Sequence, residues 1–376
     1  MSSLTLKHQS RGTRLYLLDL LRFGAAVAVV FYHLLATRSA NWNDGAKAEM
    51  EPLIAFSSYG AIGVQFFFMV SGFVILMSIW GRNISSFTAS RISRLFPAYW
   101  VAVLLCSFLF LVVAPGQFKN PSLTQILVNM TMFQSAVGVK HIDGVYWTLW
   151  IEMLFYVSVA VLAIRGLNSN KIMIFAFLWP LAGAMALTAK NGFFEALLIP
   201  KYAPFFALGM VLYVIFAEGS TLLRWLLVVL NFVFGGFMTI THFLPTMERV
   251  TGRDLSSTIV WALLAMGLLA LIAATITPMN SFGFAWMSIA GALTYPLYLV
   301  HEYWGWWIIG SLSNQLNHWV VLSFALGAVI LLAWMIYRFV ERPYARKLRI
   351  AIEKGFAPRK VTSVKPEDLS LSKSNS

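Results

Sequence analysis

Ten long apolar segments run through this 376-residue chain, and they limit its fold more than any other feature. An α-helix of about 20 apolar residues is long enough to cross the hydrocarbon core of a bilayer. Inside a bilayer the backbone must satisfy its own hydrogen bonds, which favours helices. We therefore predict an all-α polytopic membrane protein with about ten transmembrane helices, near residues 16–36, 61–80, 97–114, 146–164, 172–188, 203–217, 223–243, 257–277, 285–309 and 318–340.

The composition agrees with a membrane protein. Hydrophobic residues make up 59% of the chain and charged residues 11%, whereas soluble domains average about half and a quarter. The single cysteine, Cys106, excludes a disulfide framework and a metal–thiolate cluster. Because Cys106 lies in an apolar run without nearby cations, we expect it to pack in the core. We expect no resident metal and no permanently bound cofactor.

The basic residues indicate the topology. Of 28 Lys and Arg residues, 19 fall at one predicted membrane face and 8 at the other, although the net charge of +13 could also suggest a nucleic-acid partner. The asymmetry follows the positive-inside rule, so we predict cytoplasmic N- and C-termini and no nucleic-acid binding. We divide the chain into a cytoplasmic segment (1–15), a membrane domain (16–346) and a basic cytoplasmic tail (347–376) predicted to be disordered.

Two ionisable residues, Arg22 and His33, lie eleven positions apart in the first predicted span. At roughly 100° and about 1.5 Å per residue, they share one helix face and are separated by about 16 Å along its axis. An arginine at mid-helix costs about 2.5–3.5 kcal/mol to insert, so a functional role is favoured. The pair predicts a polar stripe that runs across the membrane.

Further polar residues fall at matching depths. Glu152 and His301 are predicted near the depth of His33 on other helices, and a carboxylate beside a histidine suits general acid–base catalysis. Asp19 is one turn from Arg22 and can pair with it. Purely structural roles remain open. The histidine and the carboxylate could form a structural polar contact, and Asp19 and Arg22 could form a neutral ion pair that holds two helices together.

The cytoplasmic ends of the predicted spans carry candidate anion-binding residues. Arg91 and Arg94 precede Pro97, which suits the first turn of the third span. Together with Arg342 they could bind a phosphate-bearing ligand, or they could simply anchor the helices at the membrane surface. We assign no role to the remaining histidines, which lie in tails, loops or span ends: His8, His141, His242 and His318.

Another motif lies at mid-depth in the second predicted span, where Ser71 precedes Gly72. Glycine lacks a Cβ atom, so Gly72 should let another helix backbone approach closely.

The order of these motifs resembles the membrane-bound acyltransferase-3 proteins, which O-acylate sugars of surface and secreted polysaccharides. The resemblance runs from about Leu17 to Arg346. It rests on Arg22 followed by His33, Ser71-Gly72-Phe73, Arg91-Ile92-Ser93-Arg94-Leu95-Phe96-Pro97, Trp147-Thr148-Leu149-Trp150-Ile151-Glu152, Tyr295-Pro296-Leu297-Tyr298-Leu299-Val300-His301 and Glu341-Arg342-Pro343.

The resemblance implies ten core helices, an acyl-CoA donor that enters from the cytoplasm and an acceptor hydroxyl near the outer face. It also implies a catalytic role for His33, a donor-side role for Arg22 and a bacterial inner membrane. Acetyl-CoA is the expected co-substrate, and a glycan or lipid-linked sugar is the expected acceptor. The glycan, the size of the acyl group and the oligomeric state are left open.

We predict direct acyl transfer. Arg91, Arg94 and Arg342 would bind the CoA phosphates, and the pantetheine arm would pass Asp19, Arg22 and Ser71. His33 would act as general base, with Glu152 or His301 orienting its ring. A covalent acyl intermediate on His33 or Ser71 remains open.

Two alternatives remain beside the enzyme. One is a proton-coupled transporter or flippase of a polysaccharide precursor, in which the polar stripe would act as a proton relay. The other is a purely structural subunit of polysaccharide assembly, which accounts for the spans but not for the stripe.

Overall fold

The computed structural model describes residues 15–38 and 41–356, and all regular elements in these ranges are helical. The α-helices are α1 (Tyr16–Phe31), α2 (Asp44–Glu49), α3 (Glu51–Ser57), α4 (Gly63–Ile79), α5 (Ile84–Phe108), α6 (Leu123–Met130), α7 (Trp147–Ala163), α8 (Ser169–Thr188), α9 (Gly192–Leu198), α10 (Ala203–Glu218), α11 (Leu222–Met238), α12 (Leu244–Thr251), α13 (Ser257–Thr275), α14 (Ala285–Leu312), α15 (His318–Ile336) and α16 (Arg342–Phe356).

Several long helices contain or continue into short π-helical or 3-10 segments. The π-helices are η1 (Tyr32–Thr37), η4 (Leu109–Val113), η6 (Thr239–Phe243) and η8 (Tyr337–Glu341). The 3-10 helices are η3 (Gly60–Ile62), η5 (Gly144–Tyr146) and η7 (Pro278–Ser281). Because π-helical turns often occur at functional sites, η1, which contains His33, is of particular interest.

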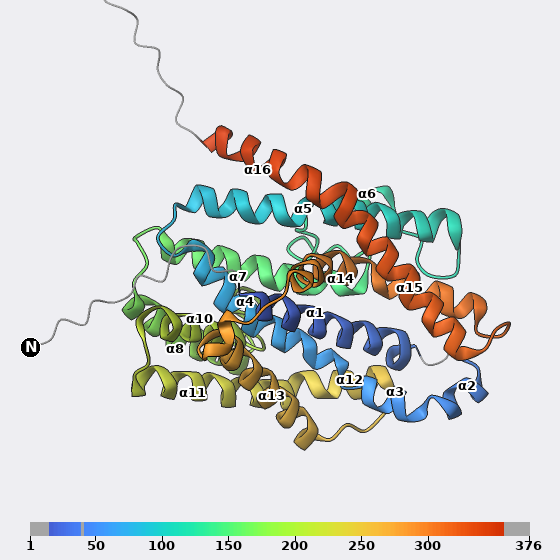
Figure 1. The fold of residues 1–376 in the computed structure, drawn as a ribbon, viewed down its shortest axis with the longest axis horizontal. Coiled ribbons are helices and arrows are strands. Elements are labelled where there is room, and N and C mark those ends of the chain that lie inside the picture. The colour runs from blue at the N-terminus through green and yellow to red at the C-terminus, as the bar shows by residue number, and fades with distance from the viewer. Residues whose placement is uncertain (1–14, 39–40, 357–376) are drawn as a thin grey trace, which may run out of the picture.

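The predicted all-α membrane fold is confirmed. Within the described residues, nine helices are long and apolar enough to cross a membrane. The remaining predicted span, 285–309, forms α14, a helix of 28 residues whose many polar and aromatic residues keep it outside those nine. The helices form a bundle in which α1 begins and α16 ends towards the same end of the molecule, at the left of Figure 1.

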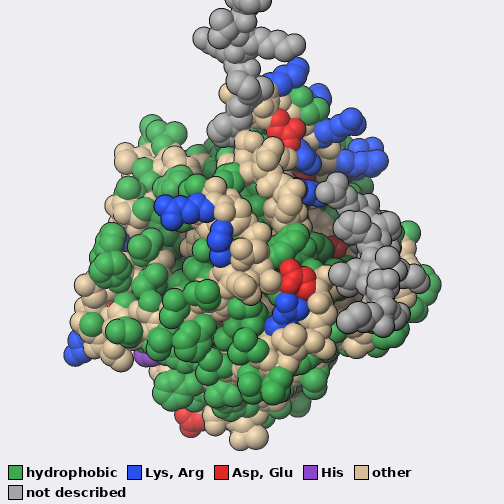
Figure 2. Space-filling view, turned by 90° about the vertical axis from the view of Figure 1, so that its left-hand side faces the viewer, with side chains coloured by type: hydrophobic (Ala, Val, Ile, Leu, Met, Phe, Trp, Pro, Cys, Tyr) green, Lys and Arg blue, Asp and Glu red, His purple; other side chains and the backbone are tan. Residues whose placement is uncertain are grey.

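That end of the bundle is rich in basic side chains. Figure 2 shows Lys and Arg gathered chiefly in its upper part, where α16 lies in Figure 1. Helix α16 contributes several of the basic residues in the described chain: Arg342, Arg346, Lys347, Arg349 and Lys354. This distribution agrees with the positive-inside pattern, while the cytoplasmic placement of the termini stays a prediction.

Two predicted boundaries are wrong. Helix α5 begins at Ile84, so Arg91 and Arg94 are helical and Pro97 lies inside the helix, although the sequence predicted a start at residue 97. Polar residues in 84–96 hide this part of the helix from a hydropathy pattern. The tail predicted to be disordered begins inside α16, which is helical to Phe356. Residues 357–376 of the tail and 1–14 of the N-terminal segment lie outside the described residues.

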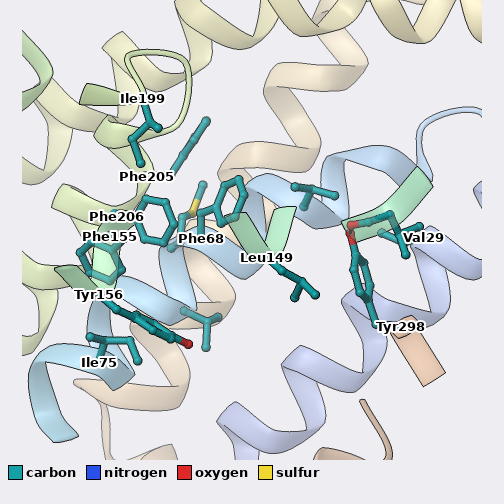
Figure 3. Packing of buried hydrophobic residues seen from close by; sticks show 14 of the residues in the cluster. Val29, Phe68, Ile75, Leu149, Phe155, Tyr156, Ile199, Phe205, Phe206 and Tyr298 are labelled. Carbon is teal, nitrogen blue, oxygen red and sulfur yellow. Dashed lines mark hydrogen bonds between the residues drawn. The ribbon is translucent and has the colours of Figure 1, made fainter. Parts of the chain in front are cut away.

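Helix α10 forms the centre of the hydrophobic core. Every residue from Ala203 to Ile215 is buried, and α10 packs against α4, α8 and α11. Figure 3 shows the aromatic centre of this packing, where the Phe206 ring lies 4.2 Å from Phe155 of α7 and 4.7 Å from Phe68 of α4, measured between ring centroids. These contacts hold α4 and α7, which carry candidate site residues, in fixed positions.

Helices α4 and α10 approach each other through two glycines. A Cβ atom on Gly72 would collide with the Phe206 carbonyl oxygen, and a Cβ atom on Gly209 would collide with the Met69 carbonyl oxygen. The prediction that Gly72 permits close backbone approach is therefore confirmed. The residue before it, Ser71, is held at this crossing.

The outer surface of the bundle is strongly apolar. Helices α8, α11 and α15 expose large hydrophobic side chains, including Phe177, Phe237 and Phe324, as expected for surfaces that face lipid.

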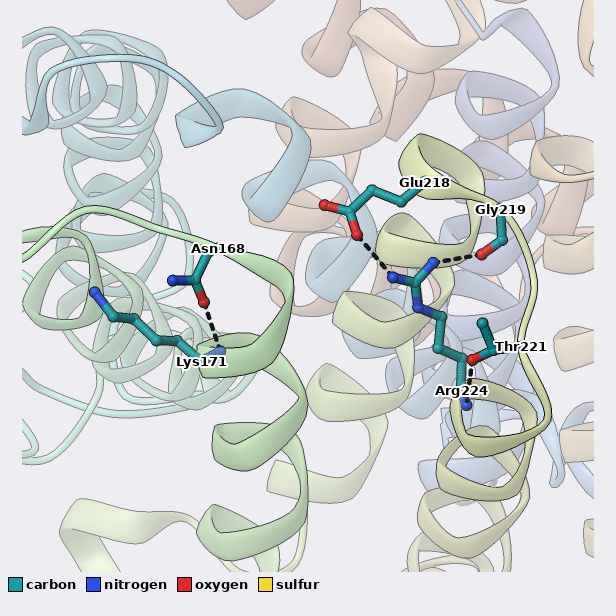
Figure 4. A network of polar contacts seen from close by, with 6 residues as sticks. All are labelled: Asn168, Lys171, Glu218, Gly219, Thr221 and Arg224. Carbon is teal, nitrogen blue, oxygen red and sulfur yellow. Dashed lines mark hydrogen bonds and ion pairs between the residues drawn. The ribbon is translucent and has the colours of Figure 1, made fainter. Parts of the chain in front are cut away.

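Polar caps occur at helix ends. Figure 4 shows two caps, in which Asn168 accepts a hydrogen bond from the Lys171 amide and Thr221 accepts one from the Arg224 amide. The Arg224 side chain also pairs with Glu218 at 2.7 Å.

We expect Gly72→Ala and Gly209→Ala to destabilise the protein by about 1–3 kcal/mol, because the added methyl group must push α4 and α10 apart. Gly327→Ala is the matched control, since a Cβ atom there meets open space on α15. Thermal unfolding of the purified variants in detergent measures the effect. Unfolding midpoints equal to that of the control would contradict the tight crossing.

Candidate active site

Two histidines from different helices form the centre of the candidate site. His33 lies in η1 and His301 in α14, and these elements meet because α1 packs along α14. The Nδ1 atom of His33 is 3.0 Å from the Nε2 atom of His301. His301 is fully buried and His33 is partly exposed, so His33 is the ring that a ligand can reach.

The hydrogen bonds determine the tautomers of the two neutral rings. The Nδ1 atom of His301 lies 3.1 Å and 2.9 Å from the carbonyl oxygens of Leu297 and Tyr298, so it must carry a proton. Its Nε2 atom is then an acceptor, and His33 must donate through Nδ1, which also lies 3.1 Å from the Val29 carbonyl oxygen. The free lone pair of His33 is therefore on Nε2.

The backbone around His33 is held by side-chain donors. Its carbonyl oxygen accepts a hydrogen bond from Trp306 Nε1 at 2.7 Å and from the Thr37 hydroxyl at 3.0 Å. A π-helical turn leaves backbone groups displaced from the regular α-helical ladder, and these donors satisfy one of them. The ring of His33 is thus held through its Nδ1 atom, and the backbone of the residue is held through its carbonyl oxygen.

His33 faces a cavity of about 440 Å³, within the usual size range of small-ligand sites. We call it the histidine cavity. Aromatic side chains contribute much of its wall, and the charged or titratable side chains that line it come from five helical or loop segments. The aromatic side chains include Tyr32, Trp147, Tyr202, Tyr298 and Trp306. The charged or titratable side chains are His33, Arg38, Lys201, His242 and Glu302.

A second group of candidate residues lies elsewhere on the stripe. Arg22, Arg91 and Arg94 line a small cavity of about 30 Å³, and we call these three residues the arginine cluster. Electrostatic interactions also join Arg22 and Arg94 to Glu341, whose side chain is mostly buried. Guanidinium groups can bind an anion because each presents several donors, and this cluster also interacts with the carboxylates of Asp19, Glu152 and Glu341.

A row of adjoining cavities, which we call the passage, lies between the arginine cluster and the histidine cavity. An intermediate cavity of about 50 Å³ shares Arg22, Ser71 and Glu152 with the cavity that the arginine cluster lines. It shares Val64 and Tyr298 with the histidine cavity. The three cavities therefore adjoin in series along the stripe that the sequence predicted from Arg22 and His33.

Of the two residues predicted to orient His33, the structure places His301 against it. Glu152 lies further along the passage, where it accepts a hydrogen bond from the Ser71 hydroxyl at 2.8 Å. Sequence depth alone could not separate the two, because depth says nothing about the direction in which each helix turns its face. Ser71 and Glu152 thus form a polar pair in the middle of the passage.

Two other predicted donor-side residues lie outside the cavity walls. Asp19 packs against Gly291 of α14, where a Cβ atom would meet the Asp19 side chain at 2.5 Å. Arg342 is exposed on α16 and lines none of the three cavities. Its neighbour Glu341 interacts electrostatically with Arg22 and Arg94 of the arginine cluster.

Several residues of the site had not been predicted from the sequence to have a role in it. Thr148 and Tyr298 share a hydrogen bond of 2.8 Å between the intermediate cavity and the histidine cavity. Arg38 and His242 line the histidine cavity, although the sequence indicated no role for either. The motif residues Thr148 and Tyr298 were visible in the sequence. Arg38 directly follows η1 and His242 lies in the π-helix η6, where periodicity gives no signal.

Glu302 belongs to a buried acidic pair. Its Oε2 atom accepts a hydrogen bond from the Val145 amide at 3.2 Å, and that amide also lies 3.1 Å from Asp143 Oδ1. The two carboxyl groups therefore lie close together around one backbone amide. Asp143 also accepts from the Cys106 thiol at 3.4 Å, so the cysteine has a packing and hydrogen-bonding role.

The fold and these cavities form a candidate site inside a membrane protein, and comparison with known proteins identifies the class of the protein. A family model described as an acyltransferase domain matches residues 15–338, and the chain belongs to the acyltransferase-3 family. It is therefore a membrane acyltransferase. Nodulation protein 10 of Rhizobium leguminosarum bv. viciae is 27% identical over 164 residues. That match covers 38% of this chain and 43% of the relative, and no solved structure matches the chain.

The hydrogen bonds predict the tautomer of His33. In protein with isotope-labelled histidine, nitrogen NMR should show His33 protonated at Nδ1 and unprotonated at Nε2 at a pH where the ring is neutral. His33→Ala removes the signal and so assigns it. In His301→Phe the acceptor is lost, and we expect the Nδ1–H form to become less populated. A dominant Nε2–H form in the unaltered protein would refute the arrangement.

Proposed function

We propose that this protein transfers an acetyl group from acetyl-CoA to a sugar hydroxyl, with His33 as general base. The observation that carries the proposal is the series of cavities from the arginine cluster to the free Nε2 atom of His33. The two ends differ in size. The narrow cavities suit an extended acyl-pantetheine arm, whereas the histidine cavity is wide enough for a saccharide.

The donor would bind at the basic end of the bundle. Arg22, Arg91 and Arg94 would bind the phosphates of CoA, since guanidinium groups form paired hydrogen bonds with phosphate oxygens. The acyl-pantetheine arm would pass Ser71 and Glu152 and bring the thioester carbonyl to Tyr298 and His33. With the N-terminus in the cytoplasm, this end faces the cytoplasmic acetyl-CoA pool and the histidine cavity opens to the outer face.

The chemical step uses the tautomer that the hydrogen bonds favour. The sugar hydroxyl attacks the thioester carbonyl carbon while its proton moves to Nε2 of His33. The tetrahedral intermediate then expels the CoA thiolate, the C–S bond breaks, and the proton on His33 passes to the sulfur. His301 is a positioning residue in this scheme, because it accepts from Nδ1–H and stabilises the imidazolium that forms at His33.

The same cavities also fit the alternative function, a proton-coupled transporter or flippase of a polysaccharide precursor. The two functions differ in one measurable respect. Purified protein in detergent, with acetyl-CoA and a candidate glycan but without any gradient, forms an acetylated product only if it is the enzyme.

We expect His33→Ala to lower the rate of acetyl transfer by about 10²–10⁴-fold, because it removes the general base. His301→Phe should lower kcat with little effect on KM for either substrate, since His301 touches neither. Mass spectrometry of the acetylated glycan measures the rate, and protein abundance in the membrane controls for folding. Near-normal transfer by His33→Ala would exclude His33 as the base.

We expect Arg91→Gln combined with Arg94→Gln to weaken acetyl-CoA binding by about tenfold or more, since charge-assisted hydrogen bonds contribute about 1.5–3 kcal/mol. Arg82→Gln is the matched control, because Arg82 is exposed near the start of the same helix and lines none of the cavities. Calorimetric titration with acetyl-CoA measures the affinity. Equal affinities in the double variant and the control would assign Arg91 and Arg94 to membrane anchoring.

A further inference from the structure

The histidine cavity contains positive charge that the proposed transfer chemistry does not use. Arg38 and Lys201 line the same cavity as His33. Among the ion pairs of the described residues, neither side chain has a carboxylate partner. Other basic residues of the same face do have one: Lys47 pairs with Asp44 at 3.0 Å and Arg253 with Glu51 at 2.6 Å.

Arg38 is held by aromatic rings. Its Cζ atom lies 4.6 Å from the Trp306 ring and 5.4 Å from the Phe118 ring. Stacking fixes the plane of the guanidinium while its N–H groups stay available for a ligand. A planar, preoriented guanidinium suits the two oxygens of a carboxylate or a phosphate.

The position of Arg38 is tied to that of the base. Trp306, on which Arg38 stacks, donates to the His33 carbonyl, and its ring lies 6.4 Å from the His33 ring. One indole therefore contacts both the anion-binding group and the backbone of the general base. The two groups lie within the span of a short saccharide.

Lys201 adds a second positive charge to the lining of the cavity. It lies just before α10, and its charge acts on His242, which also lines the cavity. Glu195 of α9 acts on His242 as well but does not line the cavity. The acidic group in the wall, Glu302, interacts with a cation of its own, Lys119, which does not line the cavity.

We propose that the acceptor bound in the histidine cavity is an acidic saccharide, whose carboxylate or phosphate group is held by Arg38 and Lys201. This inference rests on the proposed acetyl transfer and adds the class of its acceptor. The aromatic wall would pack against the sugar ring, and the anion would orient one hydroxyl towards Nε2 of His33. Basic residues are usually depleted at the outer membrane face, and binding of an anionic acceptor would account for these two cations in the cavity.

The test compares acceptors that differ only in charge. Cellobiose, cellobiouronic acid and cellobiose 1-phosphate are each titrated against the full-length protein in nanodiscs, with ligand-observed NMR as the readout. We expect one or both acidic disaccharides to bind about tenfold tighter than cellobiose, and added salt to reduce the difference. The arm with the tighter ligand tells whether a carboxylate or a phosphate is recognised.

Variants connect the preference to the two cations. Arg38→Gln should remove most of the preference for the acidic ligand, and Lys201→Gln should reduce it. Lys140→Gln should leave it unchanged, because Lys140 is exposed and does not line the cavity. Thermal unfolding midpoints show that the variants are folded. Equal binding of all three disaccharides, no binding of any of them, or an unchanged preference in Arg38→Gln would overturn the inference.

Acetyl-CoA binding to the same samples separates the two proposals. Intact acetyl-CoA binding and acetyl transfer to cellobiose, without any preference for acidic ligands, would overturn the acidic acceptor and leave the transferase function standing. Selective binding of an acidic disaccharide that depends on Arg38, without any acetyl-CoA binding, would support the cavity assignment and contradict the proposed donor.

Discussion

The hydrogen bond between His33 and His301 joins the first spanning helix to α14, and the arrangement of the site depends on it. Polar groups inside a membrane protein must be satisfied by the protein, because lipid offers no partners. Here His301 is satisfied by two carbonyl oxygens and by His33, at 2.9, 3.1 and 3.0 Å. The only nitrogen of the pair that faces the cavity without one of these bonds is Nε2 of His33. A structural requirement of the membrane therefore also prepares the chemistry.

The three cavities show how one bundle can admit two unlike ligands. The arginine cluster and the passage beside Ser71 and Glu152 are narrow and lined by charged side chains. The histidine cavity is wide and aromatic. Between them lies the hydrogen bond of Thr148 with Tyr298. In the proposed function this division separates a flexible donor arm from a sugar, and the two meet only at His33.

Much of the fold could be predicted because bilayer thickness and hydropathy set the length of each span. Periodicity also predicted that Arg22 and His33 share one helix face, and both residues line the series of adjoining cavities. It failed where polar residues continue a helix, as in the first part of α5 around Arg91, because no apolar run marks that helix. The pairing of Ser71 with Glu152 could not be predicted either, since it depends on how α4 and α7 turn their faces.

By itself, the sequence determined the membrane class, the positions of the spans and the family motifs, because these depend on composition and local spacing. Only the tertiary structure decided which partners meet. It placed His301 rather than Glu152 on His33, Glu341 rather than Arg342 near the arginine cluster, and Arg38 on the wall of the histidine cavity. The physical reason is that helix packing joins residues far apart in sequence, such as His33 and His301 at a separation of 268 positions, and the rotation of each helix is set by contacts that no local pattern contains.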